Sequence, residues 1–172
     1  MKKILNAKQL DEVLKQLAAQ IAADSGREQI VLVGIRRRGI PLAQRLAQFL
    51  EKTHHLQVPV GSLDITLYRD DLSKIAEHPI VGKTEISVSL DDKKVYLVDD
   101  VLFTGRTIRA AMDALFDLGR PSFIKLLVVV ERNGRELPIQ SDLKGLSLDV
   151  GPKGNVKVKV KEFDEEEGVD VI

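Results

Sequence analysis

Residues 95–107, VYLVDDVLFTGRT, decide the fold class of this chain. Tyr96, Leu97 and Val98 form a continuous apolar run, which is typical of a strand buried on both faces of a parallel sheet. Beyond this run, apolar residues recur at helical spacing over residues 106–118. A buried strand followed directly by an amphipathic helix is the repeating unit of α/β folds, so we expect a central, mostly parallel sheet flanked by helices.

The flanking segments continue this alternation of helices and strands. The pattern predicts a helix from Asn6 to about residue 25, a strand at 30–35, a helix at about 40–52, a strand at about 58–68 and a strand at 124–130. Such an alternation implies right-handed crossovers between parallel strands. From residue 131 onward the chain is punctuated by Gly and Pro and then becomes strand-like. We predict a single domain over residues 1–172.

The composition agrees with a small enzyme that works in the cytoplasm. A chain of 172 residues that is 44% hydrophobic can bury one core, and the absence of cysteine excludes disulfides and thiolate metal sites. No apolar run approaches the ~20 residues of a membrane span, and the start, MKKILNAKQL, lacks the apolar core of a signal peptide. We therefore expect no membrane partner. Basic and acidic residues balance at 26 each, so any RNA contact must come from a local patch.

Asp99 and Asp100 follow the central strand, at the sheet edge where α/β proteins bind ligands. The segment from Thr104 to Thr107 opens the next helix, whose first N–H groups suit a phosphate, and Gly105 allows its close approach. The two acids repel a phosphate, but they can accept hydrogen bonds from sugar hydroxyls or bind Mg²⁺ through water. The alternative is an ordinary turn in which one Asp caps the helix.

Three arginines, Arg36, Arg37 and Arg38, lie between Gly34 and Gly39 at the end of another buried strand. Unpaired charges are costly in a core, so these side chains either face solvent in a simple turn or meet an anion. The guanidinium fork suits phosphate oxygens, and glycine permits close backbone approach. The functional hypothesis is a pyrophosphate site formed by Arg36, Arg37, Arg38 and Gly39.

Residues 69–85 form a polar stretch without a clear period. Loops of this length are often lids, and a lid would shield a reactive carbon from water and bring Arg69 and Lys74 to a departing pyrophosphate. The expected lid residues are Tyr68, Arg69, Asp70, Asp71 and Lys74. An ordinary surface loop is the alternative.

The sequence resembles a known family over residues 29–139. Residues 95–107 are similar to the 5-phosphoribosyl-1-diphosphate (PRPP) motif of the type I phosphoribosyltransferases. The segments DITLYRDDLSK, VYLVDDVLFTGRTIRAAMDAL, DLGRPS and ERNGRELPI are similar to the members that regulate pyrimidine operons and also use uracil. The resemblance implies the type I phosphoribosyltransferase fold, with a small C-terminal hood at about 131–160 and a flexible lid loop. It also implies a homodimer or tetramer.

The activity that the resemblance implies is transfer of phosphoribose from PRPP to uracil with Mg²⁺, giving UMP and pyrophosphate. It further implies binding of pyr mRNA under the control of UMP or UTP. The implied catalytic residues are Asp99, Asp100, Arg38 and Arg69, with Asp99 and Asp100 holding Mg²⁺ through water or ribose. The implied PRPP contacts are Asp99, Asp100, Val101, Leu102, Phe103, Thr104, Gly105, Arg106 and Thr107. A cis peptide is expected between Arg37 and Arg38.

Phe103 supports a pyrimidine substrate. Related enzymes that use hypoxanthine or guanine generally carry an acidic residue at this position, whereas a phenyl ring cannot accept a proton but can pack beside a flat base. The resemblance places backbone contacts to uracil near Val156, Lys157 and Val158. Phe103 and these three residues are the expected base-binding set.

RNA binding has weaker support in the sequence. The candidate contacts are Lys15, Arg135, Lys144 and Lys153. Valines at 156, 158 and 160 alternate with lysines at 157, 159 and 161, either as an RNA-facing strip or as an edge strand protected from aggregation. Six acids in residues 162–170 are expected to form a solvated tail. A salvage enzyme without RNA function is therefore the alternative to a bifunctional regulator.

Overall fold

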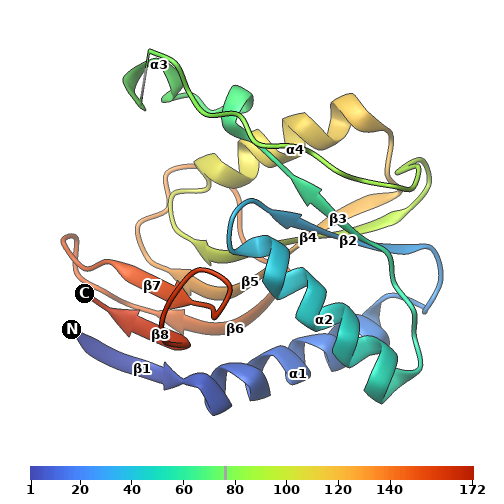
Figure 1. Cartoon of the computed structure of the whole chain (residues 1–172), viewed down its shortest axis with the longest axis horizontal. Coiled ribbons are helices and arrows are strands. Elements are labelled where there is room, and N and C mark those ends of the chain that lie inside the picture. The colour runs from blue at the N-terminus through green and yellow to red at the C-terminus, as the bar shows by residue number, and fades with distance from the viewer. Residues whose placement is uncertain (76) are drawn as a thin grey trace.

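The computed structural model describes residues 1–75 and 77–172 and is organised around a five-stranded parallel sheet (Figure 1). Its order is β3–β2–β4–β5–β6, and every pair of neighbours is parallel. These strands are β2 (Ile30–Ile35), β3 (Val60–Leu63), β4 (Lys94–Leu102), β5 (Phe123–Arg132) and β6 (Leu143–Leu148). The helices are α1 (Ala7–Asp24), α2 (Gly39–His54), the 3₁₀ turn η1 (Thr66–Tyr68), α3 (Leu72–Ile75) and α4 (Arg106–Leu118).

Helices cover both faces of this sheet, with α4 on one side and α1 and α2 on the other (Figure 1). The central strands β2, β4 and β5 carry long buried apolar runs for this reason, as parallel strands between helix layers must. In β4, Tyr96 and Val98 pack with the α1 and α2 side, whereas Val95 and Leu97 pack with α4. The alternation ends before the strand does, because Val101 packs with the α1 and α2 side and Leu102 with the α4 side.

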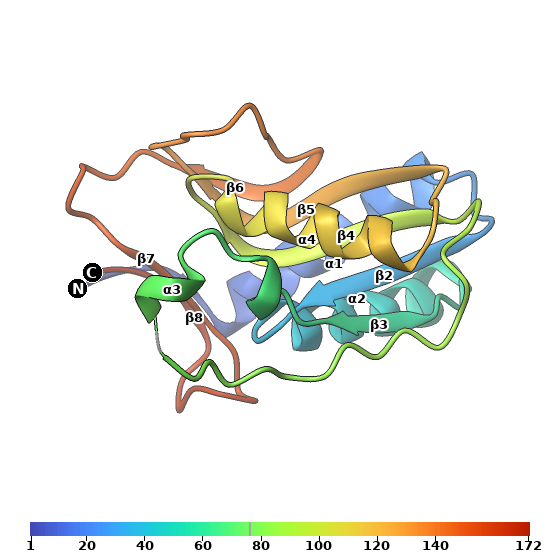
Figure 2. The same cartoon turned by 90° about the horizontal axis from the view of Figure 1, so that it is seen from above.

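A second sheet is antiparallel and joins the two ends of the chain. Its order is β1–β8–β7, with β1 (Lys2–Asn6), β7 (Val156–Lys159) and β8 (Gly168–Val171). Figure 2 shows this sheet beyond the carboxyl ends of β2 and β3. It is the hood of the molecule, and it includes residues 2–6, for which the sequence pattern predicted no strand.

The strand order creates a switch point between β2 and β4. From β2 the chain crosses through α2 to β3 at one edge, whereas from β4 it crosses through α4 to β5 on the other side. Ligands of open α/β sheets bind where successive connections diverge in this way. The arginine segment after β2 and the acid pair near the end of β4 therefore meet at one place.

Several predicted elements are confirmed. β2 and α4 have the predicted bounds, and α1 begins with the expected capping box, in which the Asn6 side chain accepts from the Gln9 N–H and the Gln9 side chain accepts from Asn6. Other bounds differ. β3 is shorter than predicted because the chain turns into η1, and β4 continues through Leu102, so the acid pair lies within the strand. β6, inside the expected hood span, belongs to the main sheet.

None of the helices in the described residues has the length and apolar character needed to cross a membrane.

Candidate active site

The acid pair is buried near the carboxyl end of β4. Asp99 is only 7% exposed, and Asp100 is partly buried. Each carboxylate accepts a backbone hydrogen bond through Oδ1: Asp99 from the Asp100 N–H at 3.0 Å, and Asp100 from the Val101 N–H at 2.8 Å. This arrangement leaves Oδ2 of each side chain for a hydroxyl or for a water on a cation.

Burial raises the pKa of both carboxyl groups. For Asp99 the main cause is loss of hydration, followed by the charge of Asp100. For Asp100 the main cause is also burial, opposed by hydrogen bonds and by the positive charge of Arg38. Two adjacent acids with little hydration suit a ligand that brings hydroxyl donors or positive charge, because such a ligand replaces the stabilisation of the carboxylates by water that burial removes.

We expect Asp99→Asn to stabilise the protein at pH 8, by about 0.5–2 kcal/mol, while impairing function. Because the pKa of Asp99 is higher in the folded than in the unfolded chain, ionisation opposes folding above the folded-state pKa. This cost disappears as the pH falls through that pKa towards the unfolded value. Thermal unfolding at pH 8 and pH 4 checks the prediction: the variant should gain stability over the wild type at pH 8 and lose that gain at pH 4. An equal difference at both pH values would show that the Asp99 charge is not the cause.

The predicted phosphate loop lies at the start of α4. Gly105 caps the helix with φ +93°, a backbone conformation that favours glycine. The Thr104 carbonyl accepts from the N–H groups of Glu136 and Leu137, at 3.0 and 3.1 Å, which fixes the loop against the segment after β5. The loop is therefore fixed by the segment after β5. The first N–H groups of α4 have no acceptor within the helix.

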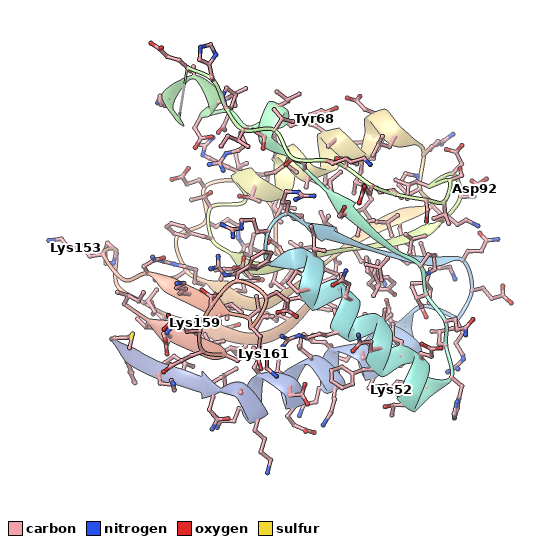
Figure 3. All side chains as sticks on the ribbon, viewed as in Figure 1. Lys52, Tyr68, Asp92, Lys153, Lys159 and Lys161 are labelled. Atoms are coloured by element: carbon pink, nitrogen blue, oxygen red, sulfur yellow. The ribbon has the colours of Figure 1, made fainter. Side chains whose placement is uncertain are left out.

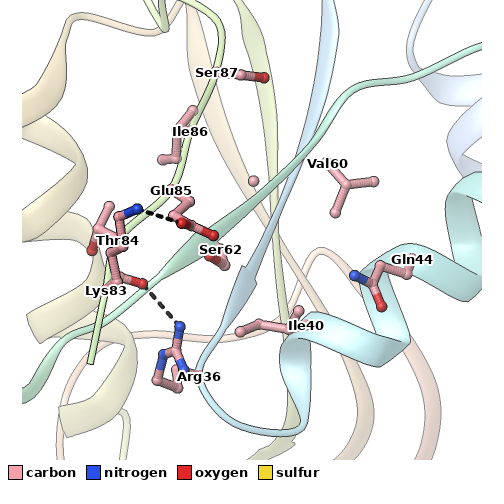
Figure 4. Close-up of a pocket in the computed structure, with 11 residues that line it drawn as sticks. Arg36, Ile40, Gln44, Val60, Ser62, Lys83, Thr84, Glu85, Ile86 and Ser87 are labelled. Atoms are coloured by element: carbon pink, nitrogen blue, oxygen red, sulfur yellow. Dashed lines mark hydrogen bonds and ion pairs between the residues drawn. The ribbon is translucent and has the colours of Figure 1, made fainter.

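The three arginines of the predicted pyrophosphate segment have different partners. Arg36 donates through Nη2 to the Lys83 carbonyl at 2.9 Å (Figure 4), and its Nε lies 3.7 Å from Asp64. The Arg37 guanidinium lies over a phenyl ring of the C-terminal region, 4.6 Å from its centroid. Arg38 forms a two-pronged ion pair with an acid from that same region.

The expected position of the cis peptide was wrong by one residue. The cis bond joins Arg36 and Arg37 rather than Arg37 and Arg38. Arg36 still extends the strand, since its N–H donates to the Leu63 carbonyl at 2.9 Å. Arg38, the residue that caps α2, already has helical dihedrals. The chain therefore changes from strand to helix between Arg36 and Arg38, and the cis bond is the first peptide bond of that change.

A cavity of about 690 Å³ brings the two motifs together. Its lining includes the predicted residues Arg36, Arg37, Arg38, Arg69, Asp99, Asp100, Val101 and Thr107. The positive charge of Arg38 opposes the rise in the pKa of Asp100, so the acid pair and the arginine segment are close enough to interact. The cavity is thus lined by two carboxylates and by three consecutive arginines.

Sequence reasoning missed Asp64, which also lines this cavity. Its carboxylate is nearly buried, and it accepts from the N–H groups of Thr66 and Gly82, both at 2.9 Å. Burial opposes ionisation, but these hydrogen bonds and Arg36 prevail and lower its pKa. The sequence pattern predicted a strand through about residue 68, so Asp64 was placed inside a strand, whereas β3 ends at Leu63 and Asp64 directly follows it.

A second cavity of about 710 Å³ adjoins the first along β3 and residues 83–87 (Figure 4). Arg36 lies between the two cavities, since it lines both. Two charged groups of the second cavity, Lys83 and Glu85, pair with each other at 2.8 Å. The candidate reaction site is therefore the first cavity, which holds the acid pair.

The expected lid contains secondary structure near its start, namely η1 and α3. Arg69 lines the cavity and is held by Asp71 through two hydrogen bonds of 2.9 Å. Asp70 binds Arg106 of the phosphate loop at 2.7 Å, and Tyr68 accepts from Arg109 through its carbonyl. Lys74 is exposed on α3, and Ala76 lies outside the described residues. These contacts place the lid residues beside the phosphate loop.

The expected base-binding residues are not among those that line the cavity. One face of Phe103 is covered by the Arg132 guanidinium, 3.9 Å from the ring centroid. Val156 and Val158 are buried in the hood, where their side chains belong to the core. Lys157 lies closer, because it pairs at 3.2 Å with the same acid that holds Arg38.

Two of the four candidate RNA contacts are brought together. Arg135 and Lys144 both bind Glu131, at 3.0 and 3.3 Å. Lys15 instead lies between acids of its own helix and the ring of Phe49. Lys153 extends outward from the turn before β7 (Figure 3).

The expectation of a solvated acidic tail holds for Glu162, Glu165 and Glu166, which are exposed, but was wrong for the other three acids. Asp164, Glu167 and Asp170 have nearly buried side chains, and they pair with lysines of the alternating strip. The valines of that strip belong to the core, and its three lysines pair with these three acids, so the positive charge of the strip is largely neutralised. The tail is folded because β8 is the middle strand of the hood and pairs with both β1 and β7, which charge patterning alone does not reveal.

Comparisons with known proteins agree with this geometry. The model of the family "Phosphoribosyl transferase domain" matches residues 1–166. A "Bifunctional protein PyrR" from Deinococcus radiodurans is 48% identical, with 98% of this chain and 91% of the relative covered. One from Thermus thermophilus is 50% identical, with 98% and 93% covered.

Solved structures show the same fold in more distant proteins. A hypoxanthine phosphoribosyltransferase from Trypanosoma cruzi, described as a mutant in a ternary substrates complex, superposes with a TM-score of 0.78 at 19% identity. The match covers 100% of this chain and 95% of that one. Since a family model and full-length relatives agree, the chain belongs to the phosphoribosyl transferase domain family and, within it, to the PyrR proteins.

Proposed function

We propose that this protein transfers phosphoribose from PRPP to uracil, giving UMP and pyrophosphate. The observation that carries the proposal is one cavity, whose lining holds the acid pair, the three arginines and Thr107 from the start of α4. PRPP carries a 5′-phosphate, a ribose with hydroxyls and a diphosphate, and these three parts match the three kinds of group. The PyrR relatives support uracil as the acceptor, as does Phe103 in place of an acid.

In this reaction the bond from ribose C1′ to the pyrophosphate oxygen breaks and a bond to uracil N1 forms, with loss of the N1 proton. The amides of residues 104–107 hold the 5′-phosphate, and the acid pair holds the ribose hydroxyls. The arginines bind the pyrophosphate and stabilise its growing negative charge. The two carboxylates stabilise the positive charge that develops on the ribose.

Mg²⁺ is the cation that this site suits. No cluster of three or more His, Cys, Asp or Glu side chains that could hold a metal occurs among residues 1–75 and 77–172. The two acids of β4 nevertheless have one oxygen each beyond their backbone bonds. Mg²⁺ keeps several waters and often binds one or two carboxylates together with substrate phosphates. Asp99 and Asp100 would hold it through water or through the ribose, and when bound it neutralises charge on the diphosphate.

The proposed activity is tested by incubating the protein with PRPP, Mg²⁺ and one nucleobase at a time. We expect UMP and pyrophosphate with uracil, and far slower turnover with hypoxanthine or guanine. Failure with every nucleobase would refute the enzymatic proposal, whereas preference for a purine would refute the substrate assignment alone.

We also propose that the protein regulates pyrimidine operon expression by binding pyr mRNA, with UMP or UTP as effector. Support comes from the relatives, which are named bifunctional, and from Arg135 and Lys144, which share one acid at the end of β5. The resemblance further suggests a cytoplasmic homodimer or tetramer. A salvage enzyme without RNA function is the competing proposal.

Titration of a labelled pyr leader hairpin at physiological salt separates these two proposals. A regulator should bind more tightly with UMP, and its affinity should fall steeply as salt rises. Replacing Arg135 and Lys144 by Ala should weaken binding and reduce the salt slope by about one per lost phosphate contact. Lys52→Ala, at the far end of α2 (Figure 3), is the matched control. Binding that ignores both UMP and RNA sequence would favour the salvage enzyme.

A further inference from the structure

Residues 160–167 form an acidic hairpin that connects the two C-terminal strands of the hood and lies against the arginine segment. Asp164 accepts from Arg38 Nη2 at 2.9 Å and from Nε at 3.1 Å. The neighbouring Phe163 lies under the Arg37 guanidinium. Arg45 of α2 also binds this hairpin, through Glu162 and Glu167. Two of the three arginines of the segment are thus held by adjacent residues of the hairpin.

Asp164 is itself fixed in place. Its side chain is only 8% exposed, and it accepts from the Val160 N–H at 3.1 Å and lies 3.2 Å from Lys157 Nζ. The hydrogen bonds from Arg38 are the main cause that holds its pKa far below the ordinary value. An ionised carboxylate with partners on the hood backbone is a rigid support for a long flexible side chain.

The geometry leaves Arg38 available to the cavity. Asp164 engages Nε and Nη2, so Nη1 is not needed for this ion pair. The same guanidinium lines the cavity, and its positive charge opposes the rise in the pKa of Asp100 that burial causes. A guanidinium has five N–H donors, so a two-pronged bond on one edge still leaves donors for phosphate oxygens on the other.

We propose that Asp164 is a positioning residue that orients Arg38 toward the diphosphate of PRPP, which makes the C-terminal hairpin part of the leaving-group site. This inference rests on the proposed phosphoribosyl transfer. Fixing the guanidinium before the substrate arrives lowers the entropy lost on binding and holds the donors where charge develops. If Asp164 instead competed with the diphosphate for Arg38, its removal would raise kcat/KM for PRPP.

The test compares Asp164→Asn with Glu165→Gln, a neighbouring acid of the same hairpin whose side chain is exposed. We expect Asp164→Asn to lower kcat/KM for PRPP by about 10–100-fold, the size of effect that a misplaced binding group produces. KM for uracil should stay unchanged, and Asp164→Glu should recover part of the loss. Glu165→Gln should behave as the wild type. Wild-type kinetics for Asp164→Asn, or a higher kcat/KM, would overturn the proposal.

Folding and function are separated by two further measurements. The depressed pKa means that Asp164 stabilises the fold above its unfolded-state pKa, so kinetics are measured well below the thermal midpoint of each variant. A purely structural role would change both KM values together. Calorimetry with inorganic pyrophosphate and Mg²⁺ gives a readout that does not need turnover: weaker binding to Asp164→Asn than to Glu165→Gln supports positioning, and equal binding contradicts it. If the wild type binds pyrophosphate but makes no UMP, the proposed function fails while the positioning of Arg38 is still tested.

Discussion

Asp100→Asn is expected to lower kcat by about 10²–10³-fold, the loss typical of removing one preorganised electrostatic group. Asparagine retains an oxygen that can accept the Val101 N–H, so the local backbone bond is preserved. What it removes is the negative charge that faces the developing positive charge on the ribose. Because burial raises the pKa of Asp100, loss of that charge should not destabilise the fold.

The measurement is steady-state production of UMP together with thermal unfolding of the same preparations. Asp11→Asn, a partly exposed acid on α1, is the matched control and should match the wild type in both assays. A folded Asp100→Asn variant with unchanged kcat would remove the acid pair from the mechanism. A variant that loses activity only because it is unfolded would have a lower thermal midpoint than the wild type, which the second assay detects.

Gly39→Ala is expected to destabilise the protein by about 1–3 kcal/mol and to raise KM for PRPP, because it overpacks a contact between main chains. A Cβ at Gly39 would collide with the carbonyl oxygen of Val98 in β4. A Cβ at Gly34 would meet the Gly39 carbonyl oxygen at 2.5 Å, so the two glycines also pack on each other. Backbone atoms cannot rotate away as a flexible side chain can. The arginine segment must therefore shift when the methyl group is added.

Urea unfolding of Gly39→Ala and Gly151→Ala measures this effect. A Cβ at Gly151 would meet nothing within 4 Å, so this variant carries the same chemical change without the collision. We expect Gly151→Ala to retain wild-type stability and KM. Equal unfolding midpoints for the two variants would show that the close approach of the main chains does not hold the arginine segment.

The part of the fold nearest the reaction could be predicted from the sequence because its signals are local. The apolar run of β4 and the helical period of α4 lie within one continuous stretch, and the bounds of α4 agree with the prediction. The glycines around the arginines were also noticed. The sequence predicted that glycine is needed there for the backbone to approach a ligand. The structure adds a second reason, because Gly34 and Gly39 are also needed for close packing between main chains.

The hood could not be predicted because its contacts are long-range. β1 pairs with β8, which joins the first residues of the chain to the last. Arg38 and Asp164 are 126 residues apart, so nothing in the local pattern links them. The six acids near the C-terminus were interpreted from their charge alone. The burial of Asp164, Glu167 and Asp170 depends on lysine partners and strand pairing that only the folded chain brings together.

The placement of PRPP is the feature on which the proposed chemistry depends. A crystal structure of the protein grown with PRPP and Mg²⁺ measures it directly. We expect the 5′-phosphate within hydrogen-bond distance of the N–H groups of residues 104–107, the ribose hydroxyls on Asp99 and Asp100, and the diphosphate on Arg38. PRPP bound in the reverse orientation, with its 5′-phosphate on the arginines, or bound elsewhere on the molecule, would show that the three groups do not have the roles assigned to them.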